Sequence, residues 1–144
     1  MRVLIDEDTA IQLAEILRLL LRGHQVDHVP QIGWKGKKDK YVLKDAPNAG
    51  YHALITGDRR QLNDPAECKA IKRSGLHHVT YSHRRQGTQG LALALGAVIA
   101  AMPMIMAELE TTEGQRLVRI VGLDPHRRFE IQDPARQPPP YWPR

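Results

Sequence analysis

The chain has 144 residues, of which 42% are hydrophobic and only 5% aromatic, and its formal net charge is +5. This length suits one domain with a short appendage, whose core is built mainly from aliphatic side chains. The single cysteine, Cys68, excludes an internal disulfide and a cysteine-ligated metal site. Acidic residues follow the first apolar run at once, and the longest apolar segment, residues 91–107, is broken by Pro103 and at the short end for a membrane span. We therefore expect a cytoplasmic protein with no secretory leader and no membrane partner.

The first half of the chain alternates apolar runs with segments typical of helices. Strands are predicted over residues 2–5, 25–29, 53–56 and 76–81. Helices are predicted between them, over residues 10–22, 39–46 and 65–74, with loops at residues 31–38 and 58–62. Thr9 and Asp64 suit the N-caps of the first and third helices. The first helix has a broad apolar face that comprises Ile11, Leu13, Ala14, Leu17, Leu20 and Leu21. The alternation predicts a three-layer α/β/α fold with a mainly parallel central sheet.

The second half differs in composition. A polar linker over residues 82–86 precedes a long apolar helix over residues 88–108. Residues 116–123 and 128–132 alternate around the turn at residues 124–126, which predicts a β-hairpin. Residues 134–144 contain five prolines, a composition that favours an extended or disordered tail. We therefore divide the chain into a core domain (1–86), a helix-and-hairpin extension that packs on the core or on a partner (87–133), and a Pro-rich tail (134–144).

Basic residues gather in two clusters. The first comprises Lys35, Lys37, Lys38, Lys40 and Lys44, and the second comprises Lys69, Lys72, Arg73, Arg84 and Arg85. Such clusters attract phosphate backbones, although a solvated surface explains them equally well.

Acidic residues stand at the ends of two predicted strands. Asp6, Glu7 and Asp8 directly follow the first strand, and Asp58 follows the third. Because parallel strands present their carboxyl ends at one edge of a sheet, where open α/β sheets bind ligands, we expect these carboxylates to lie together. Carboxylate oxygens suit Mg²⁺ or Mn²⁺, which can activate water and stabilise charge on a phosphodiester. The pattern predicts a metal-dependent site for phosphodiester hydrolysis, with Asp39 at the start of the second helix as a third acid.

Several of these acids also have structural interpretations. Asp39 suits the N-cap of its own helix. Glu7 and Asp8 cannot both point inward beside Asp6, so at least one of them is a surface residue or a cap. The seven histidines are scattered along the chain, and a histidine-ligated zinc site is not expected.

Four short motifs in order are similar to those of the PIN-like nucleases. They are residues 4–8 (Leu-Ile-Asp-Glu-Asp), 23–29 (Gly-His-Gln-Val-Asp-His-Val), 32–36 (Ile-Gly-Trp-Lys-Gly, followed by Asp39) and 54–59 (Leu-Ile-Thr-Gly-Asp-Arg). Their spacing agrees with the family over residues 1–82, and the acidic triplet resembles its compact branch. Two departures stand out. Arg60-Gln61-Leu62 replaces a frequent further acid and aromatic residue, and the extension has no counterpart in the resemblance.

The resemblance implies a ribonuclease that depends on Mg²⁺ or Mn²⁺ and is often the toxin of a bacterial toxin–antitoxin pair. Carried over by position, Asp6, Asp39 and Asp58 are the catalytic and metal-binding acids, supported by Thr56 and Glu7. The implied partners are an RNA substrate and a cognate, DNA-binding antitoxin. The wide apolar surface of the long helix is also compatible with a homodimer.

Side chains that flank the acids are expected to contact RNA through charge or stacking: Trp34, Lys35, Lys37, Lys38, Arg59 and Arg60. Trp34 has a second interpretation, as a loop side chain that packs back on the core.

Two other functions stay open. A PIN-like protein without catalysis would bind nucleic acid or a protein partner through the same edge, with the Arg60 guanidinium replacing a metal ion. A phosphotransfer receiver-like domain also has acids at strand ends, but it needs a lysine after a late strand, where this chain has Ser82-His83.

Overall fold

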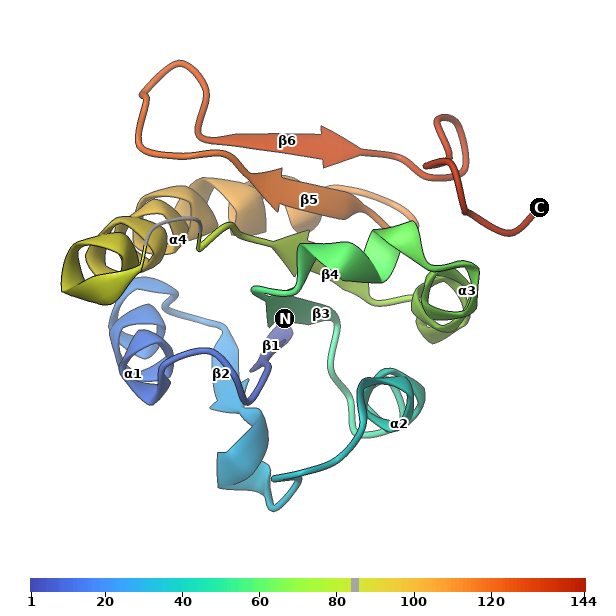
Figure 1. Cartoon of the computed structure of the whole chain (residues 1–144), viewed down its shortest axis with the longest axis horizontal. Coiled ribbons are helices and arrows are strands. Elements are labelled where there is room, and N and C mark those ends of the chain that lie inside the picture. Colours follow the sequence, from blue (N-terminus) through green and yellow to red (C-terminus); the bar gives the residue numbers. More distant parts are fainter. Residues whose placement is uncertain (84–85) are drawn as a thin grey trace.

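Six strands form one sheet in the structure, a computed structural model that describes residues 1–83 and 86–144 (Figure 1). The strands are β1 (Arg2–Ile5), β2 (Gln25–His28), β3 (Ala53–Thr56), β4 (His77–Thr80), β5 (Leu117–Ile120) and β6 (Phe129–Gln132). Their spatial order is β2-β1-β3-β4-β5-β6, with β6 antiparallel to β5 and all other neighbours parallel. The mainly parallel sheet confirms the predicted fold class. Arg84 and Arg85, assigned above to a basic cluster and the linker, lie outside the described residues.

In the described residues, four α-helices connect these strands: α1 (Ile11–Leu20), α2 (Asp39–Asp45), α3 (Pro65–Ser74) and α4 (Gly87–Leu109). Asp64 caps α3 as predicted, because its carboxylate accepts hydrogen bonds from the backbone N–H groups of Ala66 (2.7 Å) and Glu67 (3.2 Å). Two 3₁₀ helices, η1 (Val29–Ile32) and η2 (Arg59–Asn63), occupy segments not predicted as helical.

The helices cover both faces of the sheet, with α1 and α4 on one face and α2 and α3 on the other (Figure 1). Alternate strand residues supply the two cores. In β1, Val3 and Ile5 pack in the core of the α1 and α4 side, whereas Leu4 packs in the other core. Strands buried on both faces are nearly continuous apolar runs, which is why the sequence pattern located them.

The apolar face of α1 is narrower than predicted. Leu13, Ala14 and Leu17 are fully buried, but Ile11 and Leu20 are 40% and 46% exposed. A helix that packs on a sheet buries one stripe of its surface, and these two side chains lie outside that stripe.

The extension after residue 86 continues the same sheet and core. β5 pairs in parallel with β4, and β5 and β6 form the predicted hairpin. α4 buries Val98, Ala101, Met102 and Ile105 completely in the core that it shares with α1. By length and composition alone, α4 is the one helix among the described residues that could cross a membrane. Residues 91–107 alone are at the short end for a span and are expected to be broken by Pro103, whereas the helix extends beyond them at both ends and continues through Pro103.

The Pro-rich tail is folded against the protein, contrary to the prediction of an extended or disordered end. Trp142 packs against the core on the α2 and α3 side, and Lys72 of α3 donates a hydrogen bond to the carbonyl oxygen of Pro143 (2.8 Å). Burial of the large apolar Trp142 side chain favours docking of the tail, and a prediction based on the number of prolines does not take this into account.

The strand order creates a crevice at one point. β1 lies between β2 and β3, so the chain moves to one side after β1 and then crosses back to the other side to form β3. Ligands of open α/β sheets bind outside the carboxyl ends of the strands at such a reversal. A ligand site is therefore expected at the ends of β1 and β3, residues 5–6 and 56–58.

Candidate functional site

A small cavity lies at this crevice. Its volume is about 30 Å³, enough for one water molecule or one metal ion. Its polar lining residues are Asp6, Glu7, Asp8, Lys37, Asp39, Thr56 and Gln61. The structure thus brings together four carboxylates from the end of β1 and the start of α2, with a single lysine among the residues that line the cavity.

Asp6 is held at both carboxylate oxygens. The hydroxyl of Thr56 donates a short hydrogen bond to Oδ2, and Thr9 donates to Oδ1 from its hydroxyl (3.0 Å) and its backbone N–H (3.2 Å). Burial raises the pKa of Asp6 above the ordinary value of 3.8, although the hydrogen bonds from Thr56 and Thr9 oppose the shift. The protein therefore holds this carboxylate in a fixed orientation at some electrostatic cost.

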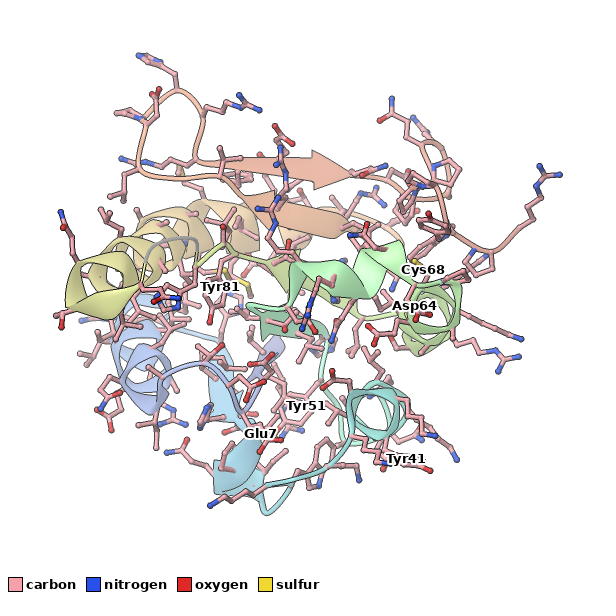
Figure 2. All side chains as sticks on the ribbon, in the orientation of Figure 1. Glu7, Tyr41, Tyr51, Asp64, Cys68 and Tyr81 are labelled. Atoms are coloured by element: carbon pink, nitrogen blue, oxygen red, sulfur yellow. The ribbon has the colours of Figure 1, made fainter. Side chains whose placement is uncertain are left out.

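Thr9 belongs to the site, and the prediction that it caps α1 is wrong. α1 begins after Ala10, and the Thr9 hydroxyl bonds to Asp6 and to the hydroxyl of Tyr81 (2.7 Å; Tyr81 is labelled in Figure 2). Gly57 makes room for this arrangement, because a Cβ atom there would lie 3.0 Å from the Tyr81 ring.

Thr56 connects the two predicted strand-end acids. Its hydroxyl donates to Asp6 and accepts from the backbone N–H of Asp58 (3.1 Å). The Asp58 carboxylate caps η2, accepting from the backbone N–H of Arg60 (3.0 Å) and pairing with its guanidinium (3.4 Å). Asp58 is not among the described residues that line the cavity, so it lies near Asp6 and Asp39 but outside the cavity that those two residues line.

Asp39 is oriented by a buried chain of side chains. Gln61, which is 2% exposed, donates from Nε2 to Asp39 Oδ2 (3.1 Å) and accepts at Oε1 from Nε2 of His78 (2.8 Å). Burial lowers the pKa of His78 to about 4, so the imidazole is neutral at physiological pH. Asp39 is exposed by surface area, but partial burial of its carboxylate, followed by the charges of Asp58, Asp8 and Glu7, raises its pKa against the hydrogen bond from Gln61.

The remaining acids lie around the cavity. Glu7 (labelled in Figure 2) accepts a hydrogen bond from the backbone N–H of Gly36 (3.0 Å), and Asp8 is exposed. Glu67 of α3 lines a neighbouring cleft with Glu7 and Asp39, and burial and then the negative charges of Asp58 and Asp39 raise its pKa.

The predicted RNA-contacting residues have mixed surroundings. Trp34 packs against the core and contacts Tyr51 edge-on, with 6.5 Å between ring centroids, so the packing interpretation describes its position. Lys37 lies over the Trp34 ring and pairs with Asp45 (2.5 Å). The other four are Lys35, Lys38 and Arg60, which are exposed, and Arg59, which is half-buried.

The donor chemistry of the cavity suits a hard divalent cation. Its carboxylates carry oxygen donors, and mutual repulsion contributes to the raised pKa of Asp6 and of Asp39, which a cation would relieve. In residues 1–83 and 86–144, however, no three acidic, histidine or cysteine side chains are already close enough to hold a metal ion together. The oxygen ligands therefore suit a divalent metal ion, but the carboxylates must move closer together to surround it.

Comparison with known proteins gives the family. A sequence model of the PIN-like domain matches residues 1–83, more than half of the chain. The chain therefore belongs to the PIN-like domain family, whose function in general is of the nuclease type. No curated protein and no solved structure matches the chain.

Proposed function

We propose that this protein is a ribonuclease that uses Mg²⁺ or Mn²⁺ to cleave RNA phosphodiester bonds. The observation that carries the proposal is the cavity at the β1 and β3 ends, where Asp6 and Asp39 are both oriented by hydrogen bonds and both have raised pKa values. Active sites commonly hold acids in such unfavourable surroundings. Membership of the PIN-like family supports the hydrolytic class.

In this proposal Asp6 and Asp39 hold the cation, with Glu7 and Asp8 beside them. When bound, the cation supplies activation of water and stabilisation of the charge that develops on the phosphodiester. Thr56 and Thr9 fix the two oxygens of Asp6. These contacts reduce the reorganisation that the site needs before reaction.

The lysines of the first basic cluster suit one approach to this site. A cleft of about 630 Å³ between α2 and α3 is lined by Lys37, Lys38 and Lys40 and by four acids, Glu7, Asp39, Asp64 and Glu67, so carboxylates outnumber lysines there. We assign only the exposed Lys38 and Lys40 to the RNA backbone, since ammonium groups beside a carboxylate site attract a polyanion toward the metal.

The biological role proposed is the toxin of a toxin–antitoxin pair in the cytoplasm, with an antitoxin protein as partner. This rests on the resemblance of residues 1–82 to such proteins. The second candidate function is a non-catalytic PIN-like protein that binds nucleic acid or a partner, which the contact of Arg60 with Asp58 favours because a guanidinium there competes with a cation.

The test is hydrolysis of labelled RNA by the full chain, with Mn²⁺, with Mg²⁺ and with excess chelator. We expect cleavage only with metal. Asp39→Asn should lose it, whereas Asp124→Asn should retain it, because Asp124 only accepts a hydrogen bond from the backbone N–H of His126 in the hairpin turn, and Asn can accept the same bond. Cleavage that is the same with chelator, or the same in Asp39→Asn, would refute the proposal. Absence of cleavage together with absence of calorimetric Mn²⁺ binding would favour the second candidate.

Metal affinity should depend on pH. Burial raises the pKa of Asp6 and of Asp39, so each carboxyl keeps a proton to a higher pH than an ordinary aspartate with its value of 3.8. Metal must displace that proton, and the affinity for Mn²⁺ should therefore fall as the pH is lowered from neutral toward 4. Calorimetry at several pH values measures this, and an affinity that stays constant over that range would contradict a carboxylate site.

A further inference from the structure

The extension forms a second cleft beside the acidic site. It has a volume of about 560 Å³ and lies between η2 and the strands β5 and β6, lined by Arg59, Arg60 and Arg119, by Glu130, and by the uncharged polar side chains of Asn63 and Gln132. A neighbouring hollow of about 690 Å³, at the β5 end next to α4, is lined mainly by apolar side chains such as Leu93, Val121 and Leu123, and its charged lining residues are Arg59, Arg119 and Arg127. The two hollows meet at these shared arginines. We call them together the arginine trough.

The trough carries an excess of positive charge. Glu130 is the one acidic residue among the described residues that line it, against Arg59, Arg60, Arg119 and Arg127, although Arg60 is also paired with Asp58 just outside the trough. Glu130 accepts hydrogen bonds from Arg119 (2.7 Å) and from Arg127 (2.9 Å), which hold its pKa below the ordinary value of 4.5. One carboxylate thus partly neutralises two of the guanidinium groups that line the trough.

The trough begins where the acidic site ends. Arg59 and Arg60 directly follow Asp58, and both the backbone and the side chain of Arg60 contact the Asp58 carboxylate. Arg119 lies beside Thr80 in the register of β5 and β4, and Thr80 in turn pairs with Thr56, which holds Asp6. Figure 1 shows β5 and β6 at the border of the sheet, with α4 against one face and with α2 and α3 lying away from β6 on the other.

We infer that the arginine trough binds the phosphate backbone of a single RNA strand that extends from the acidic cavity. This inference rests on the proposed function and adds residues beyond the family match to the substrate site. Guanidinium groups pair with phosphate oxygens through two parallel N–H donors, and Asn and Gln side chains are common phosphate partners. Glu130 weakens the attraction because it competes with phosphate for two of the arginines. Removing an arginine and removing the Glu130 charge should therefore change the affinity for RNA in opposite directions.

The test measures binding without cleavage. A labelled single-stranded oligoribonucleotide of about 12 nucleotides is titrated with the full chain in excess chelator, and affinity is followed by fluorescence anisotropy at several salt concentrations. Arg127→Gln should weaken binding about three- to tenfold and reduce the slope of log affinity against log salt by about 0.7. Glu130→Gln should tighten binding by a similar factor, because it frees two arginines. A merely structural role for the Glu130 ion pairs would make both variants bind more weakly or leave both unchanged.

Arg136→Gln is the matched control. Arg136 is also exposed and paired with an acid, Asp133 (3.7 Å), and it is not among the described residues that line the trough. Unchanged affinity in Arg127→Gln and Glu130→Gln would overturn the inference, and so would displacement of the RNA by polyglutamate at equal charge, which would indicate an acidic protein partner. If both variants cleaved RNA with normal kinetics and bound it with unchanged affinity, the trough would be refuted and the ribonuclease proposal would be supported. Opposite shifts of affinity without any cleavage would support the trough and refute the ribonuclease.

Discussion

Asp6→Asn is expected to reduce metal-dependent RNA cleavage by about 100-fold or more, since even partners that only orient a metal ligand typically contribute 10–100-fold. The substitution keeps the size of the side chain and one oxygen that can accept a hydrogen bond from Thr56 or Thr9. It removes the negative charge that the cation requires. The measurement is the single-turnover cleavage rate with saturating Mn²⁺, together with Mn²⁺ affinity by calorimetry.

The same variant should gain stability relative to the wild type as the pH rises. Asp6 has a raised pKa in the folded protein, so the folded state holds the proton more tightly than the unfolded state. As the pH rises above the ordinary value of 3.8, the unfolded chain ionises first, and the wild type without metal loses stability until the folded carboxyl has also ionised. Asn has no such loss. Urea unfolding in chelator, at acid and at neutral pH, should show this relative gain by the variant, and a constant difference between the two proteins would exclude it.

Gln61→Leu is expected to lower the free energy of unfolding by about 1–3 kcal/mol, because it leaves the buried Nε2–H of His78 without an acceptor. It also removes the donor that orients Asp39, so Mn²⁺ affinity should fall about 10- to 100-fold. Both effects come from one amide that joins an imidazole to a carboxylate. They are measured by urea unfolding and by calorimetry with Mn²⁺.

Gln115→Leu provides the matched control for this prediction. Gln115 donates to the carbonyl oxygens of Ile71 (2.8 Å) and Leu76 (2.7 Å), away from the cavity. Its loss should destabilise the fold to a similar degree and leave the affinity for Mn²⁺ unchanged. If both variants weakened metal binding equally, the effect would be one of general stability, and the role assigned to Gln61 would be wrong.

Most elements of this fold follow from local sequence. The strands are apolar runs bounded by turns or acids, and both β1 and β3 begin and end where the pattern places them. Errors occur where a side chain has a choice of partners. Thr9 could cap a helix or hold a carboxylate, and Trp142 could stay in solvent or dock on a core; the sequence shows the options and the tertiary structure decides.

The candidate site divides in the same way. The position of Asp6 could be predicted, because the ends of parallel strands meet at one edge, and Thr56 is implied by the family resemblance; the same edge argument places Asp58 with them, but Asp58 is not among the described residues that line the cavity. Gln61 and His78 could not be, because an amide bridge between residues 39, 61 and 78 depends on how α2, η2 and β4 are arranged in space. The one sign of Gln61 in the sequence was that residues 60–62 depart from the family pattern. This departure indicates an altered position but not the role of the residue found there.

Because β4 pairs in parallel with β5, the folded unit is larger than the segment that matches the family. The family match ends at residue 83, yet β5 supplies hydrogen bonds to one edge of β4, and α4 covers Val79 in the shared core. A segment cut at the family boundary would present β4 as a bare edge strand above an uncovered apolar sheet, the arrangement that most readily leads to aggregation. We therefore expect the residues outside the family match to keep the matched residues from aggregating.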